Sequence, residues 1–146
     1  MNRITLCPAG PDDSEFAYSV RRSAFKNYAE QVGGWDDREQ RRLHEQRFRT
    51  QDFRIIRLAD VDVGVVAITI SPDAMNLHQL FLLPDYQGRG LGRECMELLM
   101  EEAHRLVVPV RLRVLKVNRR AFVFFQRLGF TCAGETETHF LMEGIS

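Results

Sequence analysis

Hydrophobic residues near the start of the chain follow the pattern of a strand and then a helix. Ile4 to Leu6 predict a short strand that Pro8 ends. A helix is expected from about Pro11, because apolar residues then recur at helical spacing, at Phe16, Val20, Ala24 and Tyr28. The first elements are therefore a strand and an amphipathic helix.

A second helix and a hairpin are predicted next. Gly33-Gly34 interrupts the first helix, and Asp36 with Glu39 has the spacing of a capping box. The helix that follows is mostly polar, with Leu43 and Phe48 as its apolar anchors. Apolar strand patterns at 53–59 and 63–70 flank a short polar connection and predict a β-hairpin.

The stretch from Leu77 to Leu83 predicts another strand. Leu80 to Leu83 are apolar at every position, which favours a central strand covered on both faces. A helix over about 90–106 and a strand over 110–114 follow.

The last part of the chain predicts a short helix and two closing strands. The helix covers about 119–128 with Gly129 as its C-cap, and the strands in 130–142 turn around Gly134-Glu135. The order β-α-α-β-β-β-α-β-α-β-β predicts a mixed α/β fold with a mostly antiparallel central sheet and flanking helices. No linker or repeat divides the chain, so residues 1–146 are expected to form a single domain.

Composition narrows the class of protein. The chain has 20 lysines and arginines and 20 aspartates and glutamates, so its formal net charge is zero. It therefore lacks the excess of positive charge that is typical of proteins that bind nucleic acids or membrane surfaces. No apolar run reaches the roughly 20 residues that span a bilayer, and the N-terminus lacks a signal-peptide pattern. Cys7, Cys95 and Cys132 have no zinc spacing and predict free thiols without a metal site. We therefore expect a cytoplasmic protein.

The segment from Gln87 to Arg93 carries the most informative chemistry. Here an apolar strand runs into a glycine-rich turn that opens a helix. Such a turn aims backbone N–H groups and the positive end of the helix dipole at one point, which suits a phosphate. The turn lacks the GK[ST] ending of a Walker loop, and its glycines do not fit the dinucleotide fingerprint in either register. A tight connection without a ligand is the plain structural alternative.

Two segments resemble the GCN5-related N-acetyltransferases. Gln87-x-x-Gly90-x-Gly92 is similar to the loop that holds the pyrophosphate of acetyl-coenzyme A in that family, and 118–130 is similar to the family's N-x-x-A-x-x-x-Y-x-x-x-G-F segment. The resemblance covers essentially the whole chain and implies the acyl-CoA N-acyltransferase fold.

The resemblance implies a set of cofactor-binding residues. Backbone groups of Phe81, Leu82 and Leu83 would pair with the pantetheine arm, and the N–H of Leu82 would polarise the thioester carbonyl. Asn118 would bond the cofactor arm, with an N-cap as its structural alternative. The complete implied set is Phe81, Leu82, Leu83, Gln87, Gly88, Arg89, Gly90, Leu91, Gly92, Arg93, Asn118 and Phe125.

Phe125 departs from the family pattern, because many members carry there a tyrosine that protonates the leaving thiolate. His78 is the candidate general base, and strand parity places its side chain on the face of Leu80 and Leu82. Tyr28, Trp35 and His139 are candidates for the acceptor pocket, although such aromatic residues are more often core.

The sequence thus predicts an acetyl-CoA-dependent N-acetyltransferase that moves an acetyl group to a primary amine of a small molecule or peptide by direct attack in a ternary complex. A non-catalytic acyl-CoA-binding regulatory module is the alternative, and Phe125 is the feature that keeps it open. A nucleotide-binding protein is a third, weaker alternative. A homodimer through the closing strands is compatible with the fold, and the sequence does not identify the amine.

Overall fold

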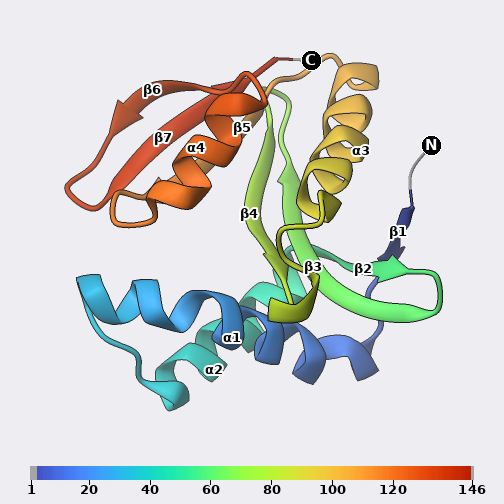
Figure 1. The fold of residues 1–146 in the computed structure, drawn as a ribbon, viewed down its shortest axis with the longest axis vertical. Helices are drawn as coiled ribbons and strands as arrows, with labels where there is room; N and C mark the ends of the chain where they lie inside the picture. Colours follow the sequence, from blue (N-terminus) through green and yellow to red (C-terminus); the bar gives the residue numbers. More distant parts are fainter. Residues whose placement is uncertain (1–2, 146) are drawn as a thin grey trace.

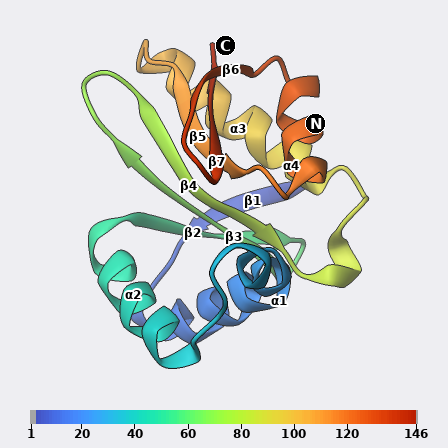
Figure 2. The same cartoon turned by 90° about the vertical axis from the view of Figure 1, so that its left-hand side faces the viewer.

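In a computed structural model, which describes residues 3–145, the protein forms one open twisted sheet with helices on both faces (Figures 1 and 2). The seven strands are ordered β1-β2-β3-β4-β5-β7-β6. The strands are β1 (Ile4–Pro8), β2 (Asp52–Leu58), β3 (Val61–Ile70), β4 (Met75–Leu82), β5 (Val110–Leu115), β6 (Thr131–Glu135) and β7 (His139–Gly144). The helices are α1 (Ser14–Val32), α2 (Asp37–Thr50), α3 (Leu91–Arg105) and α4 (Arg119–Arg127), with short 3₁₀ turns η1 (Pro11–Asp13) and η2 (Pro84–Tyr86). The predicted order of elements is confirmed.

Helices α1 and α2 cover one face of the sheet, and α3 and α4 cover the other (Figure 2). Asp36 caps α2 as predicted, since its carboxylate accepts from the backbone N–H groups of Arg38 and Glu39 at 3.0 and 3.3 Å. The anchor of α2 that the sequence did not indicate is His44, which is 4% exposed and bonds the hydroxyl of Ser14 at 3.0 Å. No helix among the described residues is long and apolar enough to cross a membrane.

Two hydrophobic clusters hold the layers together. The smaller packs α1 against β2 and β3 through residues such as Val20, Ile55 and Val65. The larger packs α3 and α4 against the other face and includes Met96, Leu99 and Phe130. Cys95 is buried in this cluster, and burial raises the pKa of its thiol to about 12, so it packs as an inert apolar residue.

Strands β4 and β5 are the parallel pair of this sheet, and they are joined only at one end. Their register covers Met75 to Leu77 with Val110 to Leu112, after which the strands separate (Figure 1). Strand β4 is central, as predicted, but the expected burial on both faces is wrong for Leu80, Phe81 and Leu82. These residues are half-buried because they border the gap that the separation opens.

The C-terminal strands differ from the prediction at their turn. Gly134 and Glu135 lie within β6 and pair with Leu141 and Phe140, so the turn falls at 136–138 instead. Gly129 follows the last turn of α4 with φ 96°, the left-handed conformation expected after a helix. The hairpin of β6 and β7 extends the sheet beyond β5 and places His139 beside the gap.

Candidate active site

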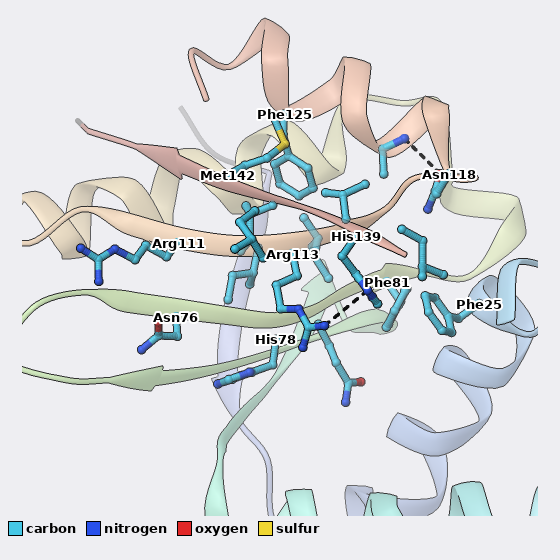
Figure 3. Close-up of a pocket in the computed structure, with 18 of the residues that line it drawn as sticks. Phe25, Asn76, His78, Phe81, Arg111, Arg113, Asn118, Phe125, His139 and Met142 are labelled. Atoms are coloured by element: carbon cyan, nitrogen blue, oxygen red, sulfur yellow. Dashed lines mark hydrogen bonds between the residues drawn. The ribbon is translucent and has the colours of Figure 1, made fainter. Parts of the chain in front are cut away.

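A cleft of about 690 Å³ occupies the gap between β4 and β5. It continues through the sheet from α4 on one face to α1 and α2 on the other (Figure 3). Phe125 and Asn118 border it on the α4 side, and Phe25 and Phe81 border it on the α1 side, with their rings 5.6 Å apart. The cleft is therefore lined by residues from both faces of the sheet.

The edge of β4 that faces the gap has free backbone groups. The N–H of Leu83 donates to the carbonyl of Val63 on β3 at 2.9 Å. Because backbone groups alternate in direction along a strand, Phe81 also faces β3, whereas Leu80 and Leu82 face the gap. The carbonyl of Leu82 accepts from Gln87 Nε2 at 3.0 Å, which ties the loop after β4 to its end.

This alternation changes the set of predicted backbone contacts. The N–H of Leu82 faces the gap, and its contact with a thioester stays a prediction. The expected pairing of Leu83 with a ligand is wrong, because its carbonyl is also used, by the N–H of Tyr86 at 2.9 Å. Phe81 likewise presents its side chain, not its backbone, to the cleft. The predicted set of backbone contacts did not include Leu80. Leu80 and Leu82 are two residues apart, so their backbone groups point in the same direction.

The glycine-rich turn has the conformation that the sequence predicted. Gly88 and Gly90 have φ of 75° and 80°, a backbone conformation that residues other than glycine rarely adopt. Gly90 is the N-cap of α3, and no side chain caps this helix. The N–H groups of Leu91, Gly92 and Arg93 consequently lie in the first turn, where a helix has no internal acceptor for them.

Positive side chains surround this turn. Arg89 lies over the ring of Tyr86 at 5.2 Å, and Arg93 is an exposed side chain 3.5 Å from Glu97. Arg3, which the sequence did not single out, donates to the carbonyl of Arg89 at 2.7 Å. Arg3 is also paired with Glu94. The turn thus combines helix N–H groups that have no internal acceptor with nearby arginines, a combination that binds phosphate groups.

Asn118 serves as the N-cap of α4. Its side-chain oxygen accepts from the N–H of Ala121 at 3.1 Å, so the structural alternative is confirmed. The residue also lines the cleft, and its amide nitrogen projects away from the helix (Figure 3). The cap and a contact with a ligand in the cleft are therefore compatible.

Phe125 is 7% exposed and packs edge-on against Phe124 and Phe130, at 5.0 and 5.5 Å between ring centroids. One side of its ring still borders the cleft. The residue is a core aromatic that contributes an apolar wall without an acidic proton.

His78 occupies a β-bulge. Ala67 pairs with Gln79 and Ile68 pairs with Leu77, which leaves His78 without a partner on β3. Its Nε2 lies 2.8 Å from Thr69 Oγ1, and Thr69 pairs with Asn76 on the α1/α2 face. The expected face, shared with Leu80 and Leu82, is therefore wrong: the bulge turns the imidazole to the opposite side (Figure 3).

The environment keeps His78 neutral at pH 7. Burial and the positive charge of Arg47 lower its pKa below the ordinary 6.5. His139 also lines the cleft, and burial and Arg113 lower its pKa. Arg113 Nη2 lies 3.3 Å from His139 Nδ1, and because a guanidinium only donates, that nitrogen accepts and Nε2 carries the proton. His78 differs in that its Nε2 faces a hydroxyl, that of Thr69, and not a guanidinium.

Tyr28 and Trp35 lie outside the cleft. Trp35 Nε1 donates to Asp37 at 2.8 Å, and its ring packs 6.4 Å from Tyr18 at the corner between α1 and α2. The prediction that Trp35 and Tyr28 border this pocket is therefore wrong, while His139 does border it. Sequence reasoning missed Arg21 and Arg47, which enter the cleft from two helices; each looked like an ordinary surface arginine.

Comparison with known proteins identifies the family. Residues 17–130 match the acetyltransferase (GNAT) family. This chain belongs to that family. As a GNAT protein it is 36% identical over 88 residues to the ribosomal protein bS18-alanine N-acetyltransferase of Salmonella typhimurium, covering 57% of this chain and 60% of that protein. It is 29% identical over 68 residues to the spermidine N(1)-acetyltransferase of Escherichia coli K12, covering 45% of this chain and 37% of that protein. The matched regions thus span less than two-thirds of either relative.

Solved GNAT structures share the fold over the full length of the chain. The PaiA N-acetyltransferase of Thermoplasma acidophilum, solved with coenzyme A, superposes with a TM-score of 0.81 at 17% identity, covering 98% of this chain and 99% of that one. A GNAT acetyltransferase of Elizabethkingia anophelis with acetyl-CoA bound gives 0.74 at 10% identity, covering 100% and 99%. These likenesses confirm the predicted fold class.

Proposed function

We propose that this GNAT protein transfers the acetyl group of acetyl-coenzyme A to a primary amine by direct attack within the cleft. The observation that carries the proposal is the opening between β4 and β5, where the N–H groups of Leu80 and Leu82 have no strand partner. Solved neighbours of the same fold contain coenzyme A or acetyl-CoA, and the curated relatives are named for acetylating an alanine of a ribosomal protein and spermidine.

The glycine-rich turn, the free edge of β4 and Asn118 together fit acetyl-coenzyme A. The turn from Gly88 to Arg93 offers N–H groups and arginines for the pyrophosphate. The free edge of β4 offers Leu80 and Leu82 for the pantetheine arm and the thioester carbonyl, and Asn118 borders the same opening. Acetyl-coenzyme A supplies the acetyl group as an activated thioester. The pyrophosphate, the pantetheine arm and the thioester thus each have a matching region of the chain.

The chain's own groups then account for the transfer. A new C–N bond forms, the C–S bond breaks, and the coenzyme leaves as thiolate. A backbone N–H of the β4 edge stabilises the charge on the carbonyl oxygen. His78, neutral and on the face of the sheet that α1 and α2 cover, takes the amine proton directly or through water. Holding both reactants in one cleft makes the attack effectively unimolecular.

Thiol release tests the proposal. Wild type incubated with acetyl-CoA should release coenzyme A thiol in the presence of a working amine, and calorimetry should detect acetyl-CoA binding but far weaker binding of NAD or ATP. Gly90→Val should lose acetyl-CoA binding, because it places a branched side chain at φ 80° in the phosphate turn. Gly33→Val is its control, since nothing lies within 4 Å of a side chain there.

Arg93→Gln provides a second variant that leaves the backbone unchanged, in case Gly90→Val misfolds, and should weaken acetyl-CoA binding several-fold. No acetyl-CoA binding by wild type at millimolar concentration would overturn the proposal. Tight acetyl-CoA binding without thiol release for any amine would favour the regulatory binding module instead.

A further inference from the structure

The cleft carries an excess of positive charge. Apart from histidines, its charged lining residues are four arginines and one glutamate: Arg21, Arg47, Arg111, Arg113 and Glu143. Glu143 is already bound to Arg111, with 2.8 Å between Oε2 and Nε. The surrounding chain has a net charge of zero, so the excess is a local property of the cleft. Such a concentration of one charge attracts ligands of the opposite sign.

Arg21 of α1 and Arg47 of α2, here called the arginine pair, have no acidic partner. No ion pair formed within residues 3–145 includes either side chain. Arg21 Nε and Arg47 Nη1 are buried without a hydrogen-bond partner. The guanidinium of Arg21 lies over the Phe25 ring at 4.6 Å, which orients it but does not neutralise it.

This arrangement is costly unless a ligand compensates it. Burial, and then repulsion from Arg47, lower the pKa of Arg21 to about 10, and burial lowers the pKa of Arg47. Both side chains therefore remain charged at neutral pH. Buried charges without a counterion destabilise a fold, and two of the same sign do so together. An anion bound between the two helices would remove both penalties.

Two unpartnered amide oxygens lie in the same part of the cleft. Gln79 is 3% exposed, and its Oε1 is buried without a hydrogen-bond partner. Gln51 follows the last residue of α2, and its Oε1 is also buried without a hydrogen-bond partner. Gln79 directly precedes Leu80, whose N–H faces the gap between the strands. This part of the cleft thus offers the N–H groups of two arginines to an oxyanion. Next to the β4 edge it also offers an amide oxygen that can accept a hydrogen bond from an amine.

We propose that the acceptor is a primary amine that also carries an oxyanion, a carboxylate or a phosphate, and that the arginine pair binds this group. The inference rests on the proposed acetyl transfer and names its substrate class. His78 lines the same cleft as the arginine pair and directly precedes Gln79 in the chain. A polycation such as spermidine would meet the arginines with the same sign of charge.

A matched set of acceptors tests the substrate class. The set is ω-amino carboxylates from glycine to 6-aminohexanoate, the carboxamides of the same lengths, aminoalkyl phosphates and spermidine. At the best length, kcat/KM for the carboxylate or the phosphate should exceed that for the carboxamide at least tenfold, and the better of the two identifies the oxyanion. Carboxamides or spermidine equal to or better than both anions at every length would overturn the inference.

Variants test the arginine pair. In Arg21→Gln and in Arg47→Gln, the preference for the anionic acceptor over its carboxamide should fall roughly 10- to 100-fold, mainly through KM. Arg49→Gln, an exposed position on α2 outside the cleft, should keep the wild-type preference. The Tm of the two cleft variants should equal or exceed that of wild type, because an unpaired buried charge is removed.

A lower Tm together with an equal loss for both kinds of acceptor would show a structural role and overturn the inference. Calorimetry of the anionic amine in the absence of acetyl-CoA separates this test from the proposed transfer. Wild type should bind the best anionic amine and Arg47→Gln should not, even if no acetyl transfer is detected; equal binding by both would also overturn the inference.

Discussion

Phe125 places an aromatic ring without an acidic proton against the cleft. A thiol with a pKa of about 8.5 leaves tolerably as thiolate, so an acid at this position helps without being required. General-acid assistance is typically worth about 10²–10⁴-fold, which an active enzyme can forgo in part. The residue therefore does not argue against catalysis.

The variant Phe125→Tyr tests this interpretation. It should fold normally, keep its acetyl-CoA affinity, and show turnover equal to or above that of wild type. Phe122→Tyr, a ring of the same helix that packs against Phe140 outside the cleft lining, is the control and should not raise turnover. A wild type that binds acetyl-CoA but is inactive with every amine, together with an active Phe125→Tyr, would show that this chain lost its activity.

His78 should affect how kcat/KM depends on pH. Its pKa lies below 6.5 in the folded protein, so the neutral, proton-accepting form dominates at pH 7 and is lost as the pH falls through the lowered pKa. Protonation of the acceptor amine already lowers kcat/KM as pH falls, and protonation of His78 should steepen that decline below about pH 6.5.

In His78→Gln the additional decline should disappear, and kcat/KM at pH 7 should fall by about 10²-fold. His104→Gln, on α3 outside the cleft, should retain the wild-type profile. If the steeper decline persists in His78→Gln, another group or water takes the proton.

At the scale of elements, strand β4 depends on its close contact with β3. A Cβ at Gly64 would clash with the carbonyl oxygen of Phe81 and lie 2.9 Å from Leu82 Cδ2. Only glycine allows the strands to pair at this distance, and the pairing holds the free edge of β4 in place.

Gly64→Ala should therefore lower the free energy of unfolding by about 1–3 kcal/mol, measured by urea denaturation. It should also weaken acetyl-CoA binding, because the backbone of Leu82 has to shift. Gly33→Ala is the control, since nothing lies within 4 Å of its Cβ. Equal stability of the two variants would show that β4 accommodates the methyl group without moving.

At the scale of the whole molecule, the two proposed half-sites lie on opposite faces of the sheet. Helices α3 and α4 provide the phosphate turn and Asn118, while α1 and α2 provide the arginine pair (Figure 2). The gap between β4 and β5 connects them, since the two strands pair only up to Leu77. An amine and a thioester that enter from opposite faces would meet beside the N–H groups of the β4 edge.

The sequence by itself determined the order of elements, the conformation of the glycine-rich turn and the family. These properties are local: helical spacing, capping residues and glycines at positive φ act over a few neighbouring residues. The Gln87-x-x-Gly90-x-Gly92 spacing is likewise a short segment whose geometry its own residues largely set. The N-cap role of Asn118 was predictable for the same reason.

Only the tertiary structure decided the acceptor side. The face of His78 depends on a bulge, because one extra residue in β4 reverses the alternation that sequence parity assumes. Arg21 and Arg47 lie on different helices, and their lack of counterions becomes visible only when both are packed into one cleft. Trp35 and Tyr28 are aromatic, as residues that border binding pockets often are, but both lie outside the cleft. Charge burial and strand separation depend on contacts between residues far apart in the chain, which no local pattern records.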